Sequence, residues 1–168
     1  MEAIEAILRD SAIFRQQEIN VAMELARYAI SEPLQKSYEF RVCVARSRVA
    51  GFVCFGPTDI GDGTYEIFWI VVGSAFRRRG IARVLLRDAE ETIRDCHARL
   101  IVVETSSTPG YEAARKFYES CGYTRAAEIP DFYAPGDSKV FYTKVLPRPV
   151  GVVSVPEDRA MSLSQVAE

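Results

Sequence analysis

The chain has 168 residues, a length that suits a single domain with one hydrophobic core. Apolar residues make up 48% and charged residues 26%, and the formal net charge of −2 gives no overall attraction to nucleic acid or to an anionic membrane. No apolar run is long enough to cross a bilayer, and the acidic start Met1–Glu5 lacks a signal-peptide pattern, so we expect a cytoplasmic protein with no nucleic-acid or membrane partner.

The first part of the chain predicts one helix followed by three strands. Apolar residues recur at helical spacing up to Pro33, which would end the helix. Two runs rich in Val, Phe and Cys follow, and Ser47-Arg48 between them predicts a hairpin turn. The third run is apolar on both faces, which is typical of a central strand. The expected bounds are residues 14–31 for the helix and 39–46, 49–56 and 64–72 for the strands.

The second part predicts a helix, a strand, another helix and two closing strands. Gly122 ends the second helix, and a loop over residues 130–138 separates the closing strands. Residues 1–146 are expected to form one domain, and the proline-containing residues 147–168 an extended or partly disordered extension. The expected bounds are 80–97 for the first helix, about 113–118 for the second, and 100–104, 123–128 and 140–145 for the strands.

An arginine-rich turn, Arg77-Arg78-Arg79-Gly80-Ile81-Ala82, lies between the central strand and the next helix. The first amides of a helix have no partner inside it, and the helix dipole adds positive character there, so such a turn suits a phosphate. Gly80 would let the backbone approach that anion. The alternative is a solvated basic turn. The other glycines of a dinucleotide fingerprint and the Gly-Lys-Ser/Thr of a P-loop are missing.

The cysteines and the histidine limit the chemistry that the chain can carry. The four cysteines form no Cys-x-x-Cys pair, so neither a zinc site nor a redox motif is indicated. A disulfide between Cys43 and Cys54 across the hairpin is the minority interpretation, and reduced thiols are expected instead. His97 is the only histidine, which speaks against a catalytic triad and a histidine-based metal centre. We therefore predict no metal.

Two motifs resemble the GNAT superfamily of N-acetyltransferases over about residues 10–146. The spacing Arg77-x-x-Gly80-x-Ala82 is similar to the acyl-CoA pyrophosphate loop of that family. The segment from Tyr111 to Tyr118, followed by Gly122-Tyr123, resembles its Asn-x-x-Ala-x-x-Phe-Tyr helix, with Tyr111 where the family usually has Asn. The resemblance implies an α/β (α+β) fold: a mixed, mostly antiparallel sheet with a splayed parallel pair and flanking helices.

The resemblance extends to a bacterial branch of the family that brings no known acceptor with it. Its signatures are Glu-Thr-Ser-Ser, here residues 104–107, and Asp-Phe-Tyr-Ala-Pro-Gly-Asp, here residues 131–137. The family implies acetyl-CoA as co-substrate, with pantetheine in the slot between the splayed strands and a bulge amide near Ile70 facing the thioester oxygen. The residues implied for this binding are Ile70, Val71, Val72, Arg77, Arg78, Arg79, Gly80, Ile81, Ala82, Arg83 and Tyr111.

Two carboxylates are candidates for the base. A lysine-type amine has a pKa of about 10.4, so an amine acceptor must lose a proton before or during its attack on the thioester. Glu66 stands eleven residues before Arg77 on the central strand, which matches the base position of the histone acetyltransferase branch. Strand parity would place it on one face with Phe68, Ile70 and Val72, and the alternative is a solvated strand-end glutamate. Glu104, at the end of the next strand, could be the base, bind a cationic acceptor, or pair with an arginine.

Tyr118 is the candidate general acid, since a phenol beside the leaving thiolate can donate a proton or a hydrogen bond; the alternative is a core tyrosine.

For the acceptor, the closing loop offers Asp131 and Tyr133 together with Phe132 and Asp137, because acidic and aromatic groups suit a small cation. The alternative is a turn with polar flanks.

The predicted function is transfer of an acetyl group from acetyl-CoA to a primary amine by direct attack, with a small-molecule amine favoured. A protein acetyltransferase acting on a lysine or an N-terminal amine is one alternative. A non-catalytic acyl-CoA-binding module is the other. A homodimer stays open as an assembly, and the identity of the acceptor does not follow from the sequence.

Overall fold

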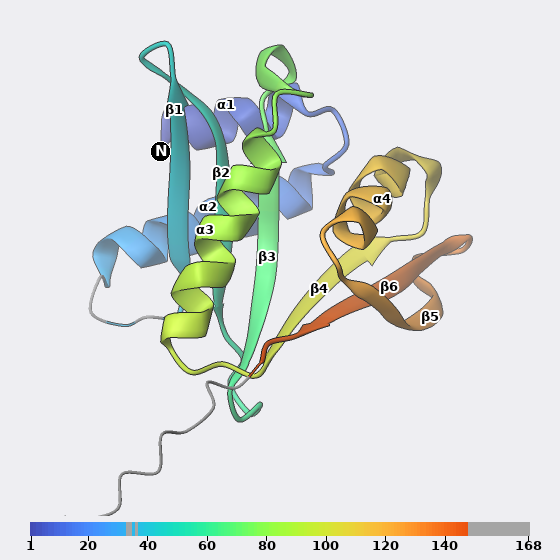
Figure 1. Ribbon diagram of the computed structural model, residues 1–168. Coiled ribbons are helices and arrows are strands. Elements are labelled where there is room, and N and C mark those ends of the chain that lie inside the picture. Colours follow the sequence, from blue (N-terminus) through green and yellow to red (C-terminus); the bar gives the residue numbers. More distant parts are fainter. Residues whose placement is uncertain (33–34, 36, 148–168) are drawn as a thin grey trace, which may run out of the picture.

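The computed structural model describes residues 1–32, 35 and 37–147. Along this part of the chain two helices are followed by three strands, then by a helix, a strand, a helix and two closing strands, as Figure 1 shows from blue to red. Two short 3-10 turns, Ser74–Phe76 and Pro109–Tyr111, precede the third and fourth helices. The elements are α1 (Glu2–Asp10), α2 (Gln16–Ser31), β1 (Glu39–Ala45), β2 (Arg48–Pro57), β3 (Thr64–Val72), α3 (Ile81–Asp95), β4 (Leu100–Ser106), α4 (Glu112–Ser120), β5 (Thr124–Ala134) and β6 (Asp137–Val145).

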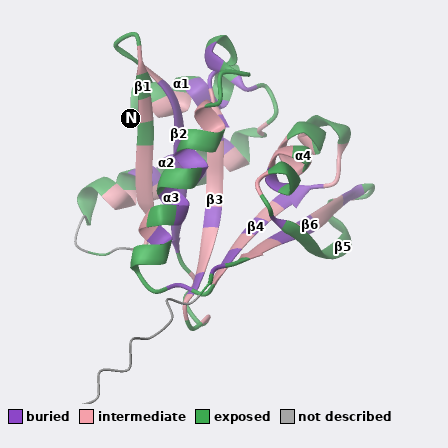
Figure 2. Ribbon diagram, viewed as in Figure 1, coloured by how far each residue is buried: buried purple, intermediate pink, exposed green. Residues whose placement is uncertain are grey.

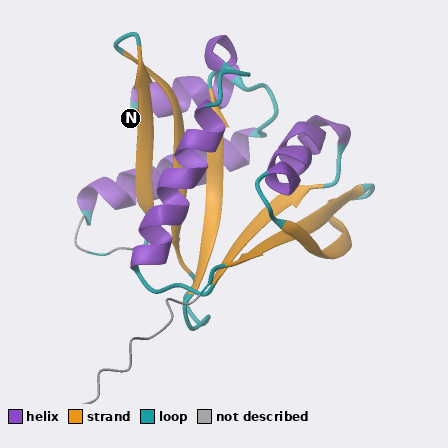
Figure 3. Cartoon of the chain, in the orientation of Figure 1, coloured by secondary structure: helices purple, strands orange, loops and turns teal. Residues whose placement is uncertain are grey.

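The strands form one six-stranded sheet in the order β1-β2-β3-β4-β6-β5. Neighbours are antiparallel except β3 and β4, which are parallel and pair only from Thr64↔Leu100 to Ile67↔Val103. Beyond that register the two strands diverge, and β4, β6 and β5 turn away from β3 (Figure 3). The structure thus confirms the predicted α/β (α+β) class, the central position of β3 and the splayed parallel pair.

Two apolar clusters cover the two faces of the sheet. On one face α1 and α2 pack against β2 and β3, with Leu8, Met23, Phe52 and Val71 among the buried residues. On the other face α3 and α4 contribute to a larger cluster that includes Ile67. Buried residues therefore follow β2 and the sheet-facing side of α3, whereas the outer turns of the helices are exposed (Figure 2). No helix in the described part of the chain is both long and apolar enough to cross a membrane.

The structure adds one helix to the predicted elements and corrects the two predicted hairpins. Helix α1 is not among the predicted elements, although Ile4, Ile7 and Leu8 recur at helical spacing. The β1–β2 turn is Arg46-Ser47 rather than Ser47-Arg48, and both residues have positive φ (52° and 58°), as a type I′ hairpin turn requires.

The second corrected hairpin is the last one. The predicted loop over residues 130–138 is mostly strand, because β5 runs to Ala134 and only Pro135-Gly136 remain as the turn. Pro130 lies within β5, which is possible because β5 is an edge strand and its pairing with β6 is irregular between Ile129 and Ala134. The predicted extension over residues 147–168 falls outside the described residues from residue 148 onward.

Candidate active site

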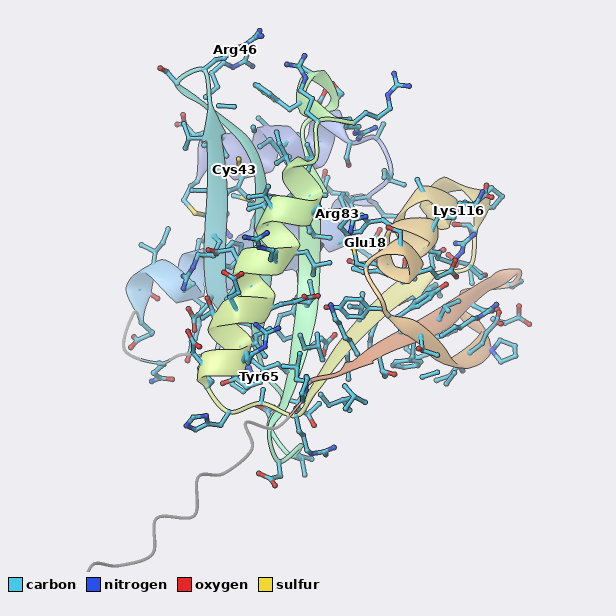
Figure 4. The ribbon with its side chains drawn as sticks, viewed as in Figure 1. Glu18, Cys43, Arg46, Tyr65, Arg83 and Lys116 are labelled. Carbon is cyan, nitrogen blue, oxygen red and sulfur yellow. The ribbon has the colours of Figure 1, made fainter. Side chains whose placement is uncertain are left out.

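A cavity of about 440 Å³ lies between β3, β4, the start of α2 and helix α4. It occupies the region where β3 and β4 diverge, and Glu18 of α2, labelled in Figure 4, lies in that region. Further walls come from Phe14, Arg15, Ser106 and Asp137. The residues predicted for the site that line this one cavity are Glu66, Ile70, Glu104, Tyr111, Tyr118 and Tyr133.

A β-bulge on β3 shapes one wall of the cavity. Cys54 pairs with Trp69 and Phe55 pairs with Ile67, which leaves Phe68 as the extra residue. Because a bulge breaks the period of two, Ile67 and Ile70 both pack toward the α3 side, whereas Trp69 and Val71 pack with α1 and α2. The predicted single face of Glu66, Phe68, Ile70 and Val72 is therefore wrong.

Glu66 and Glu104 point to the same face of the sheet. Their chain neighbours Ile67 and Val103 are buried on the α3 side, so the two carboxylates face the opposite way, toward the cavity. Burial, and next the negative charge of Glu104, raise the pKa of Glu66 to about 7, and Lys139 opposes that rise. Glu66 is thus a half-buried carboxylate that exchanges its proton near neutral pH.

Glu104 pairs with Lys139, whose Nζ lies 2.5 Å from its Oε2. The Lys139 ammonium also lies 4.0 Å from the ring centre of Phe132 and 5.7 Å from that of Tyr133. The aromatic side chains that sequence analysis offered to a cationic acceptor therefore surround a cation of the chain itself. The partner of Glu104 is a lysine and not the arginine considered from the sequence.

Tyr118 lies on α4 and is 5% exposed. Its ring contacts Phe117, Tyr123 and Tyr142 at centroid distances of 5.4, 5.6 and 6.2 Å, and it also lines the cavity. Burial raises the pKa of its hydroxyl, so the group keeps its proton at neutral pH. Tyr118 is therefore a core tyrosine that also lines the cavity, and its role as general acid stays a prediction.

Tyr111 connects α4 to α2. Its hydroxyl donates a hydrogen bond to Glu18 Oε1 at 3.2 Å, and its ring meets Phe14 edge-on at 6.4 Å. Burial raises its pKa, and the carboxylate of Glu18 adds to that rise. The side chain that replaces the Asn of the family motif therefore forms part of the cavity wall.

The start of α2 carries site residues that sequence analysis did not name. Arg15 caps the helix, and its amide donates to Glu18 Oε2 at 2.8 Å. Its guanidinium donates to the buried Asp137 at 2.6 Å, and Ser106 Oγ donates to the same carboxylate at 2.5 Å. A glutamate at the third position of a helix is a signal that the sequence does offer. In the described ranges, no group of three or more His, Cys, Asp or Glu side chains is placed to hold a metal ion.

Asp131 lies on β5 near the turn of the last hairpin and is not part of the cavity wall. Its Oδ1 accepts a hydrogen bond from the amide of Gly136 at 2.7 Å, which closes the turn. Its neighbour Tyr133 does reach the cavity. The structure therefore separates the two residues predicted for the acceptor.

The arginine-rich turn forms a second hollow of about 250 Å³ with Phe76 and Phe117. Gly80 has φ +79° and caps α3, and the helix bond from the Val84 amide to the Gly80 carbonyl leaves the amides of residues 81–83 without helical partners. Arg77 and Arg83 bond to carbonyl groups of Val72 and Ser120. The turn therefore offers backbone amides and nearby guanidinium groups, which fits a phosphate. The residues predicted for cofactor binding that line this hollow are Val72, Arg77, Arg78, Gly80, Ile81, Ala82 and Arg83.

Comparison with known proteins agrees with this arrangement. The acetyltransferase (GNAT) family model matches residues 2–123. A crystal structure from Desulfovibrio desulfuricans, of a protein assigned to the GNAT family of acetyltransferases, has a TM-score of 0.82 and 30% identity and covers 86% of this chain and 91% of its own.

More distant relatives extend the comparison. The N-acetylaspartate synthetase of Danio rerio is 34% identical over 97 residues, which are 58% of this chain and 33% of the relative, so the chain spans about a third of that protein. An aminoglycoside 6'-N-acetyltransferase complexed with coenzyme A shares the fold, with a TM-score of 0.69, 18% identity and coverage of 88% and 92%. The predicted family is thus confirmed: the chain belongs to the acetyltransferase (GNAT) family.

Proposed function

We propose that the chain transfers an acetyl group from acetyl-CoA to a small-molecule primary amine, by direct attack of the amine. The observation that carries this proposal is the joint placement of Glu66 and Tyr118 on one cavity, at the divergence of β3 and β4. One group exchanges a proton near neutral pH and the other keeps its proton. Acyl transfer to an amine that is protonated in solution is helped by a base that takes the proton from its nitrogen and by an acid that donates to the leaving thiolate.

The binding of acetyl-CoA is assigned to two adjoining segments. The amides of residues 78–83 would hold the pyrophosphate, and the edge of β3 from residue 68 to Val72, which has no strand partner on the β4 side in the described chain, would face the pantetheine. When bound, acetyl-CoA supplies the thioester that is attacked. The amide near Ile70 would donate a hydrogen bond to the thioester oxygen, where negative charge grows. CoA in the aminoglycoside acetyltransferase of the same fold supports this choice of co-substrate.

The proton transfers then follow from the residues. Glu66, when ionised, takes a proton from the acceptor ammonium, directly or through water, so that the nitrogen lone pair becomes free to attack. The Tyr118 hydroxyl donates a proton or a hydrogen bond to the departing thiolate. Cys121 is not part of this scheme, because no histidine lies near it in the sequence to activate the thiol.

Several observations favour a small acceptor over a protein. Helix α2, the β5–β6 hairpin and α4 surround the cavity, and the Arg15–Asp137 pair links two of these elements across it. A protein acetyltransferase needs an extended groove for a peptide. By their names, one relative is an N-acetylaspartate synthetase, and two fold neighbours acetylate an aminoglycoside and a ribosomal-protein alanine. Because these names cover different acceptor classes, an experiment decides the acceptor of this chain.

The test is release of free thiol from acetyl-CoA with a panel of amines: aspartate and other amino acids, polyamines, aminoglycosides, and peptides with a free N-terminus or lysine. We expect release with one of the small-molecule classes. Release only with peptides would favour the protein acetyltransferase. Binding of acetyl-CoA without any release would favour the binding module. The cytoplasmic location, the homodimer, and the division into a domain over residues 1–146 and an extension stay predictions.

A further inference from the structure

Lys139 is a buried cation beside the proposed catalytic cavity. It lies on β6, its side chain is 14% exposed, and its ammonium bonds to Glu104 Oε2 at 2.5 Å. Three rings surround the ammonium, with centroids at 4.0, 5.7 and 5.6 Å; these rings, of Phe132, Tyr133 and Phe141, are called the Lys139 cage. Aromatic faces stabilise a desolvated cation, so the cage holds Lys139 in one place.

The partner of Lys139 is the carboxylate that competes with Glu66. Both glutamates line the cavity, and they stand on the two parallel strands just where these diverge. An unpaired Glu104 would be a second base and a second negative charge at the site. The ion pair removes Glu104 as a competing base, because its carboxylate is held by an ammonium that water reaches poorly, and the positive charge of Lys139 partly offsets the negative charge of Glu104 at Glu66.

We propose that Lys139 is a positioning residue, which holds Glu104 in an ion pair beside the cavity and so leaves Glu66 as the carboxylate that takes the proton from the acceptor. This inference rests on the proposed function. Lys139 does not line the cavity itself: it holds Glu104 in place, and its own charge also acts on Glu66.

Other charged or titratable groups surround Glu66 from every neighbouring element. Glu104 acts on it most strongly and raises its pKa, while Lys139 lowers it. Burial raises the pKa values of Cys54 and Tyr133, and the negative charge of Glu66 adds to both rises. The groups that face the same cavity or act on Glu66 are Arg15 and Glu18 of α2, Cys54 of β2, Glu104 of β4, Tyr111 and Tyr118 around α4, Tyr133 of β5, and Asp137 and Lys139 of β6.

The experiment compares pH profiles of kcat/KM for variants of the ion pair, with the best amine of the panel. Lys139→Met keeps an unbranched apolar side chain in the cage but loses the charge. The pKa of Glu66 should then rise, and the decrease of kcat/KM on the acidic side of the profile, called the acid limb, should move to higher pH. Lys139→Arg retains the charge and should keep the limb close to that of the unmodified protein. Glu104→Gln removes the neighbouring negative charge and should move the limb to lower pH.

A second buried pair on the same strand provides the matched control. Lys144 of β6 bonds to Glu90 at 2.8 Å, and its ammonium lies 5.3 Å from the ring centre of Tyr123. Its side chain is 24% exposed, and neither residue lines the cavity. Lys144→Met should therefore cost stability as Lys139→Met does, while leaving the acid limb in place.

An unmoved acid limb in Lys139→Met, or equal shifts in Lys139→Met and Lys144→Met, would overturn the inference. The carboxyl resonance of Glu66 in ¹³C-labelled protein, assigned with Glu66→Gln, gives a readout that needs no turnover. If no amine is acetylated, the proposed function fails, and the resonance still decides the role of Lys139. A titration midpoint that is the same with Lys139 and with Met at this position would reject it.

Discussion

At the scale of single residues, Glu66 differs from the other carboxylates of the cavity because, in the part of the chain that the structure describes, no ion pair or side-chain hydrogen bond holds it. Asp137 pairs with Arg15 and Glu104 with Lys139, and each of these carboxylates is held at 2.6 Å or less. No ion pair of Glu66 is found among the described residues, and burial and Glu104 raise its pKa to about 7. Glu18, the remaining carboxylate of the cavity, accepts hydrogen bonds from the Tyr111 hydroxyl and the Arg15 amide, so Glu66 is the carboxylate that is free to exchange a proton.

Replacing Glu66 by Gln should lower turnover by about 10²- to 10⁴-fold, the usual contribution of a general base. In the unmodified protein, kcat/KM should fall as pH decreases through about 7, because the base is then protonated. The variant should lack this step. The measurement is the pH profile of kcat/KM, with Glu5→Gln, a change at an exposed glutamate of α1, as the control. A variant that keeps both the rate and the step would exclude Glu66 as the base.

Replacing Tyr118 by Phe should slow turnover with little change in acetyl-CoA affinity, because the change removes a hydroxyl and leaves the ring packing in place. Stopped assays for thiol release and titration calorimetry with acetyl-CoA measure the two quantities. Tyr142→Phe is the matched control, since that buried tyrosine contacts the same cluster and its hydroxyl donates to Glu119 away from the cavity. Equal rates for the Tyr118 variant and the unmodified protein would remove the acid role.

At the scale of elements, the turn before α3 combines a backbone requirement with a binding role. Gly80 needs positive φ, and a Cβ at this position would meet no protein atom within 4 Å. The glycine is therefore required by the turn and not by protein packing. The free amides of the first helical turn follow directly from this geometry.

Gly80→Asp should weaken acetyl-CoA binding by about 100-fold. Two like charges 4–5 Å apart repel by about 3–4 kcal/mol at an effective dielectric constant of about 20, and each ~1.4 kcal/mol is a factor of ten in affinity. Gly63→Asp is the control, because Gly63 also has positive φ (+59°) but precedes β3 at its opposite end. Calorimetric affinities of both variants give the comparison. Retained affinity in Gly80→Asp would reject the phosphate assignment.

The order of elements from α2 onward was predictable from the sequence, because each strand or helix carries a strong periodic pattern and a local end signal such as Gly122. The bulge at Phe68 was not predictable in position, since it depends on how β2 and β3 pair. The same applies to β5, where pairing with β6 extends a strand through Pro130. Local patterns specify an element, and its partners specify its register and length.

At the scale of the whole molecule, the site is assembled from segments far apart in the chain. Arg15 and Asp137 are 122 residues apart, and Glu104 and Lys139 are 35 apart. Motifs and spacing were enough to propose Glu66, Glu104 and Tyr118, because each lies within a family signature or at a known spacing from one. Arg15, Glu18 and Lys139 could not, since their contribution depends on tertiary contacts that one sequence does not report.

The raised pKa of Glu66 also has a consequence for stability. A carboxyl whose pKa is higher in the folded than in the unfolded chain stabilises the folded state at low pH, and this is lost as pH rises from about 4.5 to about 7. Glu66→Gln should therefore increase the free energy of unfolding at pH 8 by about 2 kcal/mol, after allowance for the partial exposure of the group. At pH 4.5 the variant and the unmodified protein should be nearly equal. Urea unfolding at the two pH values measures this, and equal stability at pH 8 would contradict it.

Because β3 pairs with β4 over only a short segment, the angle at which the two strands diverge is set at that segment. The pairs from Thr64↔Leu100 to Ile67↔Val103 form the pivot, and the diverging segments beyond it are the two arms. Glu66 lies within the pivot, opposite Val102, whereas Tyr118 lies on α4, which follows β4 in the chain. Ile67 and Val103 are both buried at this pivot, so a change in their bulk would alter the angle between the arms. Alignment of the acid with the base thus depends on two apolar side chains that do no chemistry.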